Sequence, residues 1–148
     1  MEVKVKKLNP KAILPEYQTE HSAAMDAHAC LDEPMTLQPL QRAMVPTGIA
    51  FELPEGYEMQ VRARSGLSIK HGIAMVNGVG TIDADYRGEL NILVINLGQE
   101  AFTIEPDMRI AQLVINRYEK ITWQLTEDLS ETARGAGGFG STGFDNKA

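Results

Sequence analysis

Apolar and polar residues alternate along much of this chain. In the segment 57–64 (YEMQVRAR), every second residue is apolar or aromatic and the residues between are polar or charged. Successive side chains of a β-strand point to opposite faces, so this period of two is typical of a half-buried strand. The alternation recurs at 3–5, 49–53 and 121–125. No window of a dozen residues carries a 3.6-residue apolar stripe, and we expect helix only as a turn or two near 65–71.

Turn signals such as Asn77-Gly78 and Arg87-Gly88 separate the strand-like segments at spacings that suit short antiparallel strands. The segment 90–97 is apolar on both faces apart from two asparagines, and 109–118 is similar. This pattern predicts strands buried on both sides, between two packed sheets or against a second subunit. The sequence therefore predicts an all-β sandwich or jelly roll and argues against a βαβ fold.

Length and charge exclude several classes of protein. A chain of 148 residues is expected to form one domain, and its formal net charge of -6 provides no general attraction for nucleic acid. The single cysteine, Cys30, excludes an internal disulfide and a cysteine-rich zinc site. No apolar run approaches the roughly 18 residues of a membrane span, and residues 1–7 do not resemble a signal peptide. We expect a cytoplasmic protein that binds neither membranes nor nucleic acid.

The composition changes sharply near the C-terminal end. Residues 126–134 are polar, and 135–143 contain five of the 13 glycines. Such a segment has little apolar surface to bury, which predicts a flexible tail at 134–148 attached to a folded domain at 1–133. The tail is either a disordered terminus or a segment in which Arg134 and Phe139 order over a flat anionic ligand. Its Gly-x-Gly-x-x-Gly spacing cannot open a βαβ unit, because only eight residues follow the last of these glycines.

Arg64-Ser65-Gly66 follows the clearest strand-like segment directly. A guanidinium, a hydroxyl and an approachable glycine amide at a strand end suit phosphate oxygens, although an exposed arginine before a turn explains the same residues. Gln112 is a polar amide inside an apolar strand. It must find hydrogen bonds, either within the structure or to a ligand.

Two aspartates stand among apolar or small residues. Asp83 lies in the segment 77–89 (NGVGTIDADYRGE), which has the pattern of a hairpin. It is either a general base that takes a proton from water or a residue that caps a turn. A calcium loop is excluded, because Arg87 and Val94 stand where oxygen ligands are needed. Asp26 lies among small residues and needs an arginine or a metal-bound water as its partner.

Five segments, in their order along the chain, resemble the five motifs of the trimeric deoxyuridine triphosphate nucleotidohydrolases, or dUTPases. These segments are 23–26 (AAMD), 64–68 (RSGLS), 80–89 (GTIDADYRGE), 109–113 (RIAQL) and 134–143 (RGAGGFGSTG). Ala24, Ala27 and the pair Asp107-Met108 depart from the usual family residues. These departures affect only local loop geometry.

The resemblance implies a distorted jelly-roll, or β-clip, subunit in a homotrimer whose active sites are shared between subunits. It implies hydrolysis of dUTP to dUMP and diphosphate with Mg²⁺ on the triphosphate, which limits uracil incorporation into DNA and supplies dUMP for thymidylate synthesis. Asp83 is then the general base, and Asp26 supports the Mg²⁺ through water or fixes an arginine. The implied substrate-binding residues are Arg64, Ser65, Gly66 and Gln112 for the phosphates, Asn77, Thr81 and Ile82 for uracil, Tyr86 for deoxyribose, and Arg134, Phe139, Gly140 and Ser141 from the closing tail.

Two other functions are compatible with a chain of this type. The related dCTP deaminases share the fold but need a different catalytic acid and a Pro-Gly in place of Ala84-Asp85. A nucleotide-binding trimer without turnover is expected to lack Asp83 or the Phe139 segment. Both are present, which favours the hydrolase.

Overall fold

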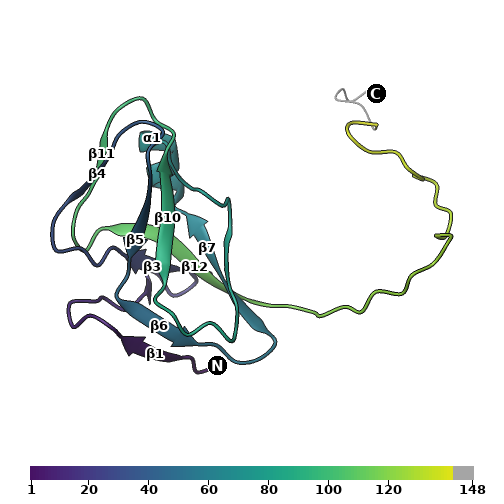
Figure 1. Ribbon diagram of the computed structural model, residues 1–148, viewed down its shortest axis with the longest axis horizontal. Coiled ribbons are helices and arrows are strands. Elements are labelled where there is room, and N and C mark those ends of the chain that lie inside the picture. Colours follow the sequence, from purple (N-terminus) through teal and green to yellow (C-terminus); the bar gives the residue numbers. More distant parts are fainter. Residues whose placement is uncertain (142–148) are drawn as a thin grey trace.

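The computed structural model describes residues 1–141 (Figure 1). Its regular elements are strands, apart from one short helix. The elements, in chain order, are β1 (Lys4–Lys7), β2 (Glu16–Tyr17), β3 (Met25–His28), β4 (Met35–Leu37), β5 (Arg42–Pro46), β6 (Ile49–Glu52), β7 (Tyr57–Ala63), α1 (Ser65–His71), β8 (Ile73–Met75), β9 (Gly80–Ile82), β10 (Asn91–Asn96), β11 (Phe102–Ile104) and β12 (Arg109–Arg117). The expected all-β architecture is confirmed. The alternating segment 57–64 supplies β7, and the expected short helix is α1.

The strands form antiparallel sheets whose neighbours are mostly distant in sequence. The largest sheet has the order β2-β3-β12-β7-β9, and a second sheet has the order β5-β10-β8. Two smaller pairs, β1-β6 and β11-β4, complete the jelly-roll body. Because β12 lies between β3 and β7, it brings residues from three distant parts of the sequence together across one sheet.

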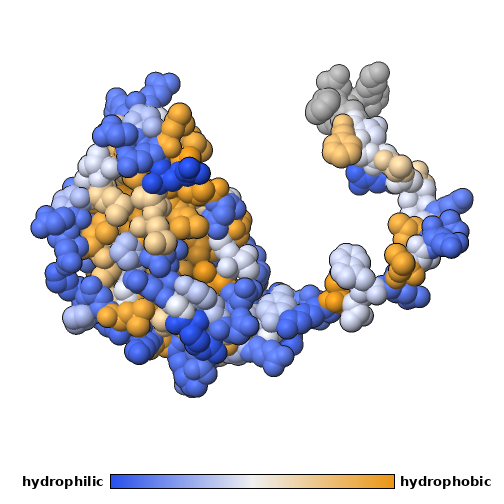
Figure 2. All heavy atoms as spheres, viewed as in Figure 1, coloured by the Kyte–Doolittle hydropathy of each residue, from blue (hydrophilic) through white to orange (hydrophobic). Residues whose placement is uncertain are grey.

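The core lies between the inward faces of these sheets. The alternation along β7 places Met59 and Val61 inside, and Ile92 and Val94 of β10 are fully buried. The opposite face of β10 is different, because Leu93 is exposed beside the exposed Met44 on β5. Among residues 1–141, therefore, one face of the segment 90–97 is covered, and the face that carries Leu93 is not. Figure 2 shows apolar residues gathered on the visible side of the body.

Backbone packs directly on backbone where α1 ends. Gly72 has φ of 71° and terminates the helix, and its carbonyl accepts a hydrogen bond from the Leu97 N–H at 2.9 Å. A Cβ atom at Gly72 would lie 2.3 Å from the Gly98 nitrogen, and one at Gly98 would lie 2.5 Å from the His71 carbonyl oxygen. The helix end is thus held against the β10–β11 turn by a contact that leaves no room for either side chain.

Residues 121–141 extend away from the body, and we call this segment the arm (Figure 1). The strand expected at 121–125 is not formed there, and its apolar residues Ile121, Trp123 and Leu125 are 66%, 91% and 99% exposed. Figure 2 shows apolar residues along the arm, well separated from the body. A strand needs a neighbouring strand to pair with, and the described part of the chain gives the arm none.

In the part of the chain that the structure covers, no helix has the length and apolar character that a membrane crossing requires.

Candidate active site

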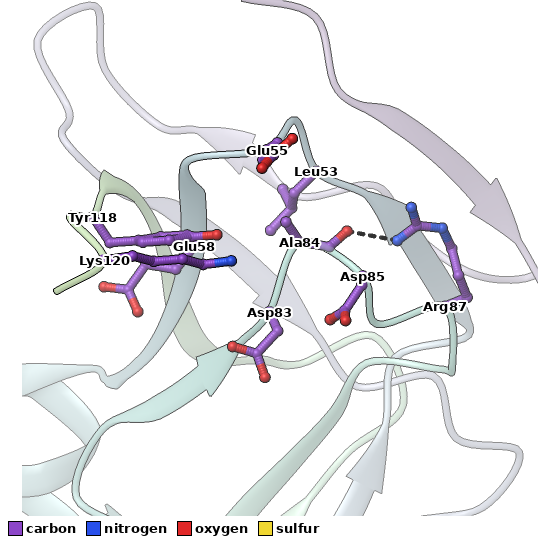
Figure 3. Close-up of a pocket in the computed structure, with 9 residues that line it drawn as sticks. All are labelled: Leu53, Glu55, Glu58, Asp83, Ala84, Asp85, Arg87, Tyr118 and Lys120. Carbon is purple, nitrogen blue, oxygen red and sulfur yellow. Dashed lines mark hydrogen bonds between the residues drawn. The ribbon is translucent and has the colours of Figure 1, made fainter. Parts of the chain in front are cut away.

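Asp83 directly follows β9, the edge strand that pairs with β7. Its carbonyl accepts a hydrogen bond from the Tyr86 N–H at 3.2 Å, which closes a turn over residues 83–86. Figure 3 shows the carboxylates of Asp83 and Asp85 turned to the same side of this turn, away from Leu53 and Glu55. The side chain of Asp83 is exposed, so water can reach the carboxylate expected to act as a base.

A cavity of about 620 Å³ borders this turn. Its lining residues are Leu53, Glu55, Glu58, Asp83, Ala84, Asp85, Arg87, Tyr118 and Lys120. Four of the nine are acidic, which is an unfavourable environment for three phosphate groups. The residues expected to bind phosphate are not among them.

The expected phosphate-binding residues line a separate cavity of about 300 Å³. Arg64, Ser65 and Gly66 come from the β7–α1 junction, and Gln112 comes from the middle of the neighbouring strand β12. The structure thus brings these four predicted residues together from two segments that are far apart in sequence. Lys70 and His71 line the same cavity, and the sequence analysis did not identify them.

Asp26 is the buried anion behind this cavity. Its side chain is only 4% exposed, with Arg109 Nη1 at 3.1 Å from one carboxylate oxygen and Arg64 Nε at 3.4 Å from the other. Gln112 Nε2 donates a hydrogen bond to the carboxylate at 3.3 Å, because Gln112 is the partner of Asp26 in the β12–β3 pairing. A buried carboxylate needs such partners to offset the loss of hydration. Of the two partners considered for Asp26, the structure supplies the arginine.

Two members of this network, Arg109 and Gln18, were missed by sequence reasoning. Arg109 Nη1 donates to the side-chain oxygen of Gln18 at 2.8 Å as well as to Asp26, and Arg64 Nη1 donates to the Arg109 carbonyl at 2.8 Å. The motifs identify Arg109 only as the first residue of one segment. Its partnership with Asp26 depends on strand register across 83 positions of sequence, for which the sequence carries no local signal.

His28 lies at the end of β3, beside the same network. Burial lowers the pKa of His28, and the positive charge of Arg109 lowers it further. Its Nδ1 atom is buried and has no hydrogen-bond partner among the described residues. The neutral imidazole is therefore the form that this environment favours.

The remaining expected residues lie in two further places. Asn77 is exposed at the turn between β8 and β9, with Thr81 and Ile82 on β9 and Tyr86 just beyond it. In the arm, Arg134 Nε donates to the Gly137 carbonyl at 2.8 Å, and the Phe139 ring is fully exposed. Gly140 has φ of 90°, and the Ser141 N–H donates to the Gly138 carbonyl at 3.0 Å. The last two residues of the fifth motif, 142 and 143, lie outside the described residues.

An arginine, a hydroxyl, a glycine and a carboxamide that line one cavity of a jelly-roll scaffold have the chemistry that suits phosphate oxygens, and Asp83 lines a separate cavity. Residues 10–143 match the family model for dUTPase. The deoxyuridine 5'-triphosphate nucleotidohydrolase of Rickettsia felis is 55% identical over 143 residues, which cover 96% of this chain and 97% of that protein. The chain belongs to the dUTPase family, as the five motifs indicated.

Solved structures agree with this assignment. The Staphylococcus bacteriophage 80alpha dUTPase with dUPNHPP superimposes with a TM-score of 0.88 at 29% identity, covering 97% of this chain and 99% of that one. A mutant dUTPase from phage phi11 of S. aureus, in which a structural Mg(II) ion is coordinated, gives a TM-score of 0.78 at 25% identity over 86% of this chain and 98% of the other. The jelly-roll fold is therefore the one shared by dUTPases.

Proposed function

We propose that this chain hydrolyses dUTP to dUMP and diphosphate as a homotrimer in which different copies supply different parts of each active site. The observation that carries this proposal is the separation of the parts. Asp83 lines one cavity, Arg64 and Gln112 line another, and the arm extends away from both. A second copy can bring its hairpin to the phosphate-binding cavity, and the arm can span the distance between subunits.

Asp83 acts as the general base in the proposed reaction. Its carboxylate orients a water molecule and takes its proton as the oxygen attacks the α-phosphorus. The bond between the α-phosphorus and the bridging oxygen breaks, and diphosphate leaves with the electron pair. Hydrolysis of this kind removes dUTP that would otherwise enter DNA as uracil and supplies dUMP for thymidylate synthesis, in the cytoplasm.

The phosphates bind in the cavity lined by Arg64, Ser65, Gly66 and Gln112. Charged hydrogen bonds from a guanidinium to phosphate oxygens are short and strong. Arg64 is held by the buried Asp26 before substrate arrives, so less side-chain entropy is lost on binding. Asp26 acts on the phosphates through Arg64 and Gln112.

Residues of the hairpin 77–86 contact the uracil and the deoxyribose of the substrate. Asn77 and the strand residues Thr81 and Ile82 face the uracil edge, and the Tyr86 ring packs on the deoxyribose where a 2′-hydroxyl would need space. The tail then closes over the nucleotide. Arg134 reaches phosphate, Phe139 stacks on uracil, and Gly140 and Ser141 contact the phosphates.

Mg²⁺ fits this site as an ion carried by the substrate. Among residues 1–141 no cluster of three His, Cys, Asp or Glu side chains could hold a metal, and both oxygens of Asp26 already have cationic partners. Mg²⁺ often binds through substrate phosphates and retained waters, with few protein ligands. When bound, Mg²⁺ neutralises phosphate charge. If it also contacts Asp26 through a water molecule, that carboxylate has to bind the water as well as its arginine partners.

Subunit complementation tests the shared site. Asp83→Asn and Arg64→Ala are each expected to lower dUTP turnover by about a hundredfold or more, measured as diphosphate release with Mg²⁺. In trimers assembled from an equal mixture of the two variants, about a quarter of the sites should contain an intact Asp83 and an intact Arg64 from different copies. Activity should return to about that fraction of the wild-type value.

The matched control replaces the Arg64→Ala partner with a chain that carries both substitutions. That mixture contains no intact Asp83 and should stay inactive. Light scattering on the wild-type protein should give the mass of three copies of the 16.3 kDa chain. A failure to restore activity in mixed trimers would place Asp83 and Arg64 of each site in the same copy, and a monomeric mass would exclude a shared site.

A further inference from the structure

The turn after Asp83 is fixed from several sides. The Tyr86 N–H donates to the Asp83 carbonyl at 3.2 Å. Arg87 Nη1 donates to the Ala84 carbonyl at 2.7 Å, as Figure 3 shows, and to the Tyr86 carbonyl at 3.0 Å. The side chain of Arg87 thus binds across the turn that connects the catalytic base to the aromatic ring.

The ring of Tyr86 is fixed as well. Its hydroxyl donates to the Glu89 carbonyl at 2.9 Å, so the side chain folds back over its own loop. The residue is still 46% exposed, which leaves part of the ring available to a ligand. An exposed tyrosine normally samples several rotamers, and this hydrogen bond favours one of them.

Gly88 lies directly beneath that ring. A Cβ atom at this position would lie 2.3 Å from the Tyr86 hydroxyl oxygen, 2.6 Å from Cζ and 2.9 Å from Cε2. Gly88 is not among the residues with positive φ, so its backbone conformation is open to any L-residue. The contact that requires glycine here is therefore the one with the Tyr86 ring.

We propose that Gly88 and the backbone carbonyl of Glu89 determine sugar specificity by holding the Tyr86 ring where it excludes a 2′-hydroxyl. This inference rests on the role proposed above for Tyr86. Gly88 is a positioning residue, since it acts on the nucleotide through the ring. A side chain at position 88 pushes the ring out of its place. Because Tyr86 is 46% exposed, the ring can move toward solvent without disturbing the buried core.

The test is the ratio of kcat/KM for dUTP to kcat/KM for UTP, measured with Mg²⁺. This ratio does not depend on the fraction of active enzyme, so a loss of folded protein does not change it. Gly88→Ala should lower the ratio by about tenfold or more, because discrimination depends on ring placement within a fraction of an ångström. Tyr86→Phe, which keeps the ring and loses its hydrogen bond, should lower it by about threefold to tenfold.

A second comparison separates action through the ring from a general effect on the loop. In a Tyr86→Ala background, adding Gly88→Ala should leave the ratio unchanged, because the ring is already absent. An equal effect of Gly88→Ala with and without the ring would overturn the proposal. So would a wild-type ratio in Gly88→Ala or, if that variant fails to fold, a wild-type ratio in Tyr86→Phe. A wild-type enzyme that releases no diphosphate from dUTP would instead overturn the proposed function itself.

Discussion

The candidate functional side chains of the body and of the arm differ in their burial and in their contacts. In the body, the carboxylate of Asp26 is buried and bound by two guanidinium groups and a carboxamide, so the side chains proposed to bind phosphate are oriented without a ligand. In the arm, Arg134 donates to the neighbouring Gly137 carbonyl and Phe139 is fully exposed. The difference follows from composition, because the glycine-rich segment has too little apolar surface to hold a fixed position. In the proposed site, the body residues are therefore placed before a ligand binds, and we expect the arm residues to take their places only on binding.

Deleting residues 134–148 should separate these two parts most sharply. Turnover of dUTP should fall by about a hundredfold or more, since the groups that close the site and exclude water are lost. The midpoint of thermal unfolding and the number of copies per assembly found by light scattering should match the wild type, because Phe139 and Arg134 add no burial to the body. Unfolding of the truncated chain would show that the tail is structural, and full activity would remove the roles given to Arg134 and Phe139.

Asp26→Ala should have its main effect on stability. The change leaves Arg64, Arg109 and Gln112 without their common partner, and breaking a buried pair costs about 3–5 kcal/mol. The two arginines are 27% and 42% exposed and can partly regain water, so we expect a loss of about 2–4 kcal/mol in the free energy of unfolding in urea. Asp32→Ala, which removes an exposed ion pair with Lys11, is the control and should give no resolved change. Equal effects of the two substitutions would mean that burial does not matter at Asp26.

The smallest expected effect is a dependence of stability on pH that comes from His28. Its pKa is lowered in the folded protein from an ordinary value of 6.5, mainly by burial, so the unfolded chain binds the proton more readily. The free energy of unfolding should therefore fall as the pH drops below 6.5 and through the folded pKa, by less than about 1 kcal/mol for this half-buried group. Urea unfolding between pH 5 and 7.5 (roughly the range in which histidine titrates) should show a weaker pH dependence in His28→Asn than in wild type. An unchanged dependence would assign it to other groups.

The fold was largely predictable because period and turn signals are local. The alternation of apolar and polar residues at 57–64 predicts β7. The short helix α1 (Ser65–His71) begins where this alternation ends. The segment 121–125 has the same alternation and is not a strand in the described chain. Its pattern gives the propensity for a strand, but pairing requires a neighbour that local sequence does not supply.

For the candidate site, the sequence indicated which residues to consider, but it did not indicate the contacts among them. The motifs identified Arg64, Gln112 and Asp26, yet the contacts among them depend on the register of β12 against β3 and β7. Register is a property of two strands and the turns that join them, and a single strand does not encode it. For the same reason, neither the partner of Arg109 nor the role of Gln18 could be predicted from local sequence.

The contact between Gly72 and Gly98 limits how this sequence can vary over generations. A side chain at Gly72 would meet the backbone of Gly98, and one at Gly98 would meet the His71 carbonyl, so a change at one glycine does not make room for a change at the other. Mutations on the exposed surface of α1 can therefore accumulate one at a time, while any larger residue at either glycine forces the C-terminal end of the helix away from the β10–β11 turn. Libraries that diversify the cavity lined by Arg64 and Gln112 should hold these two positions constant.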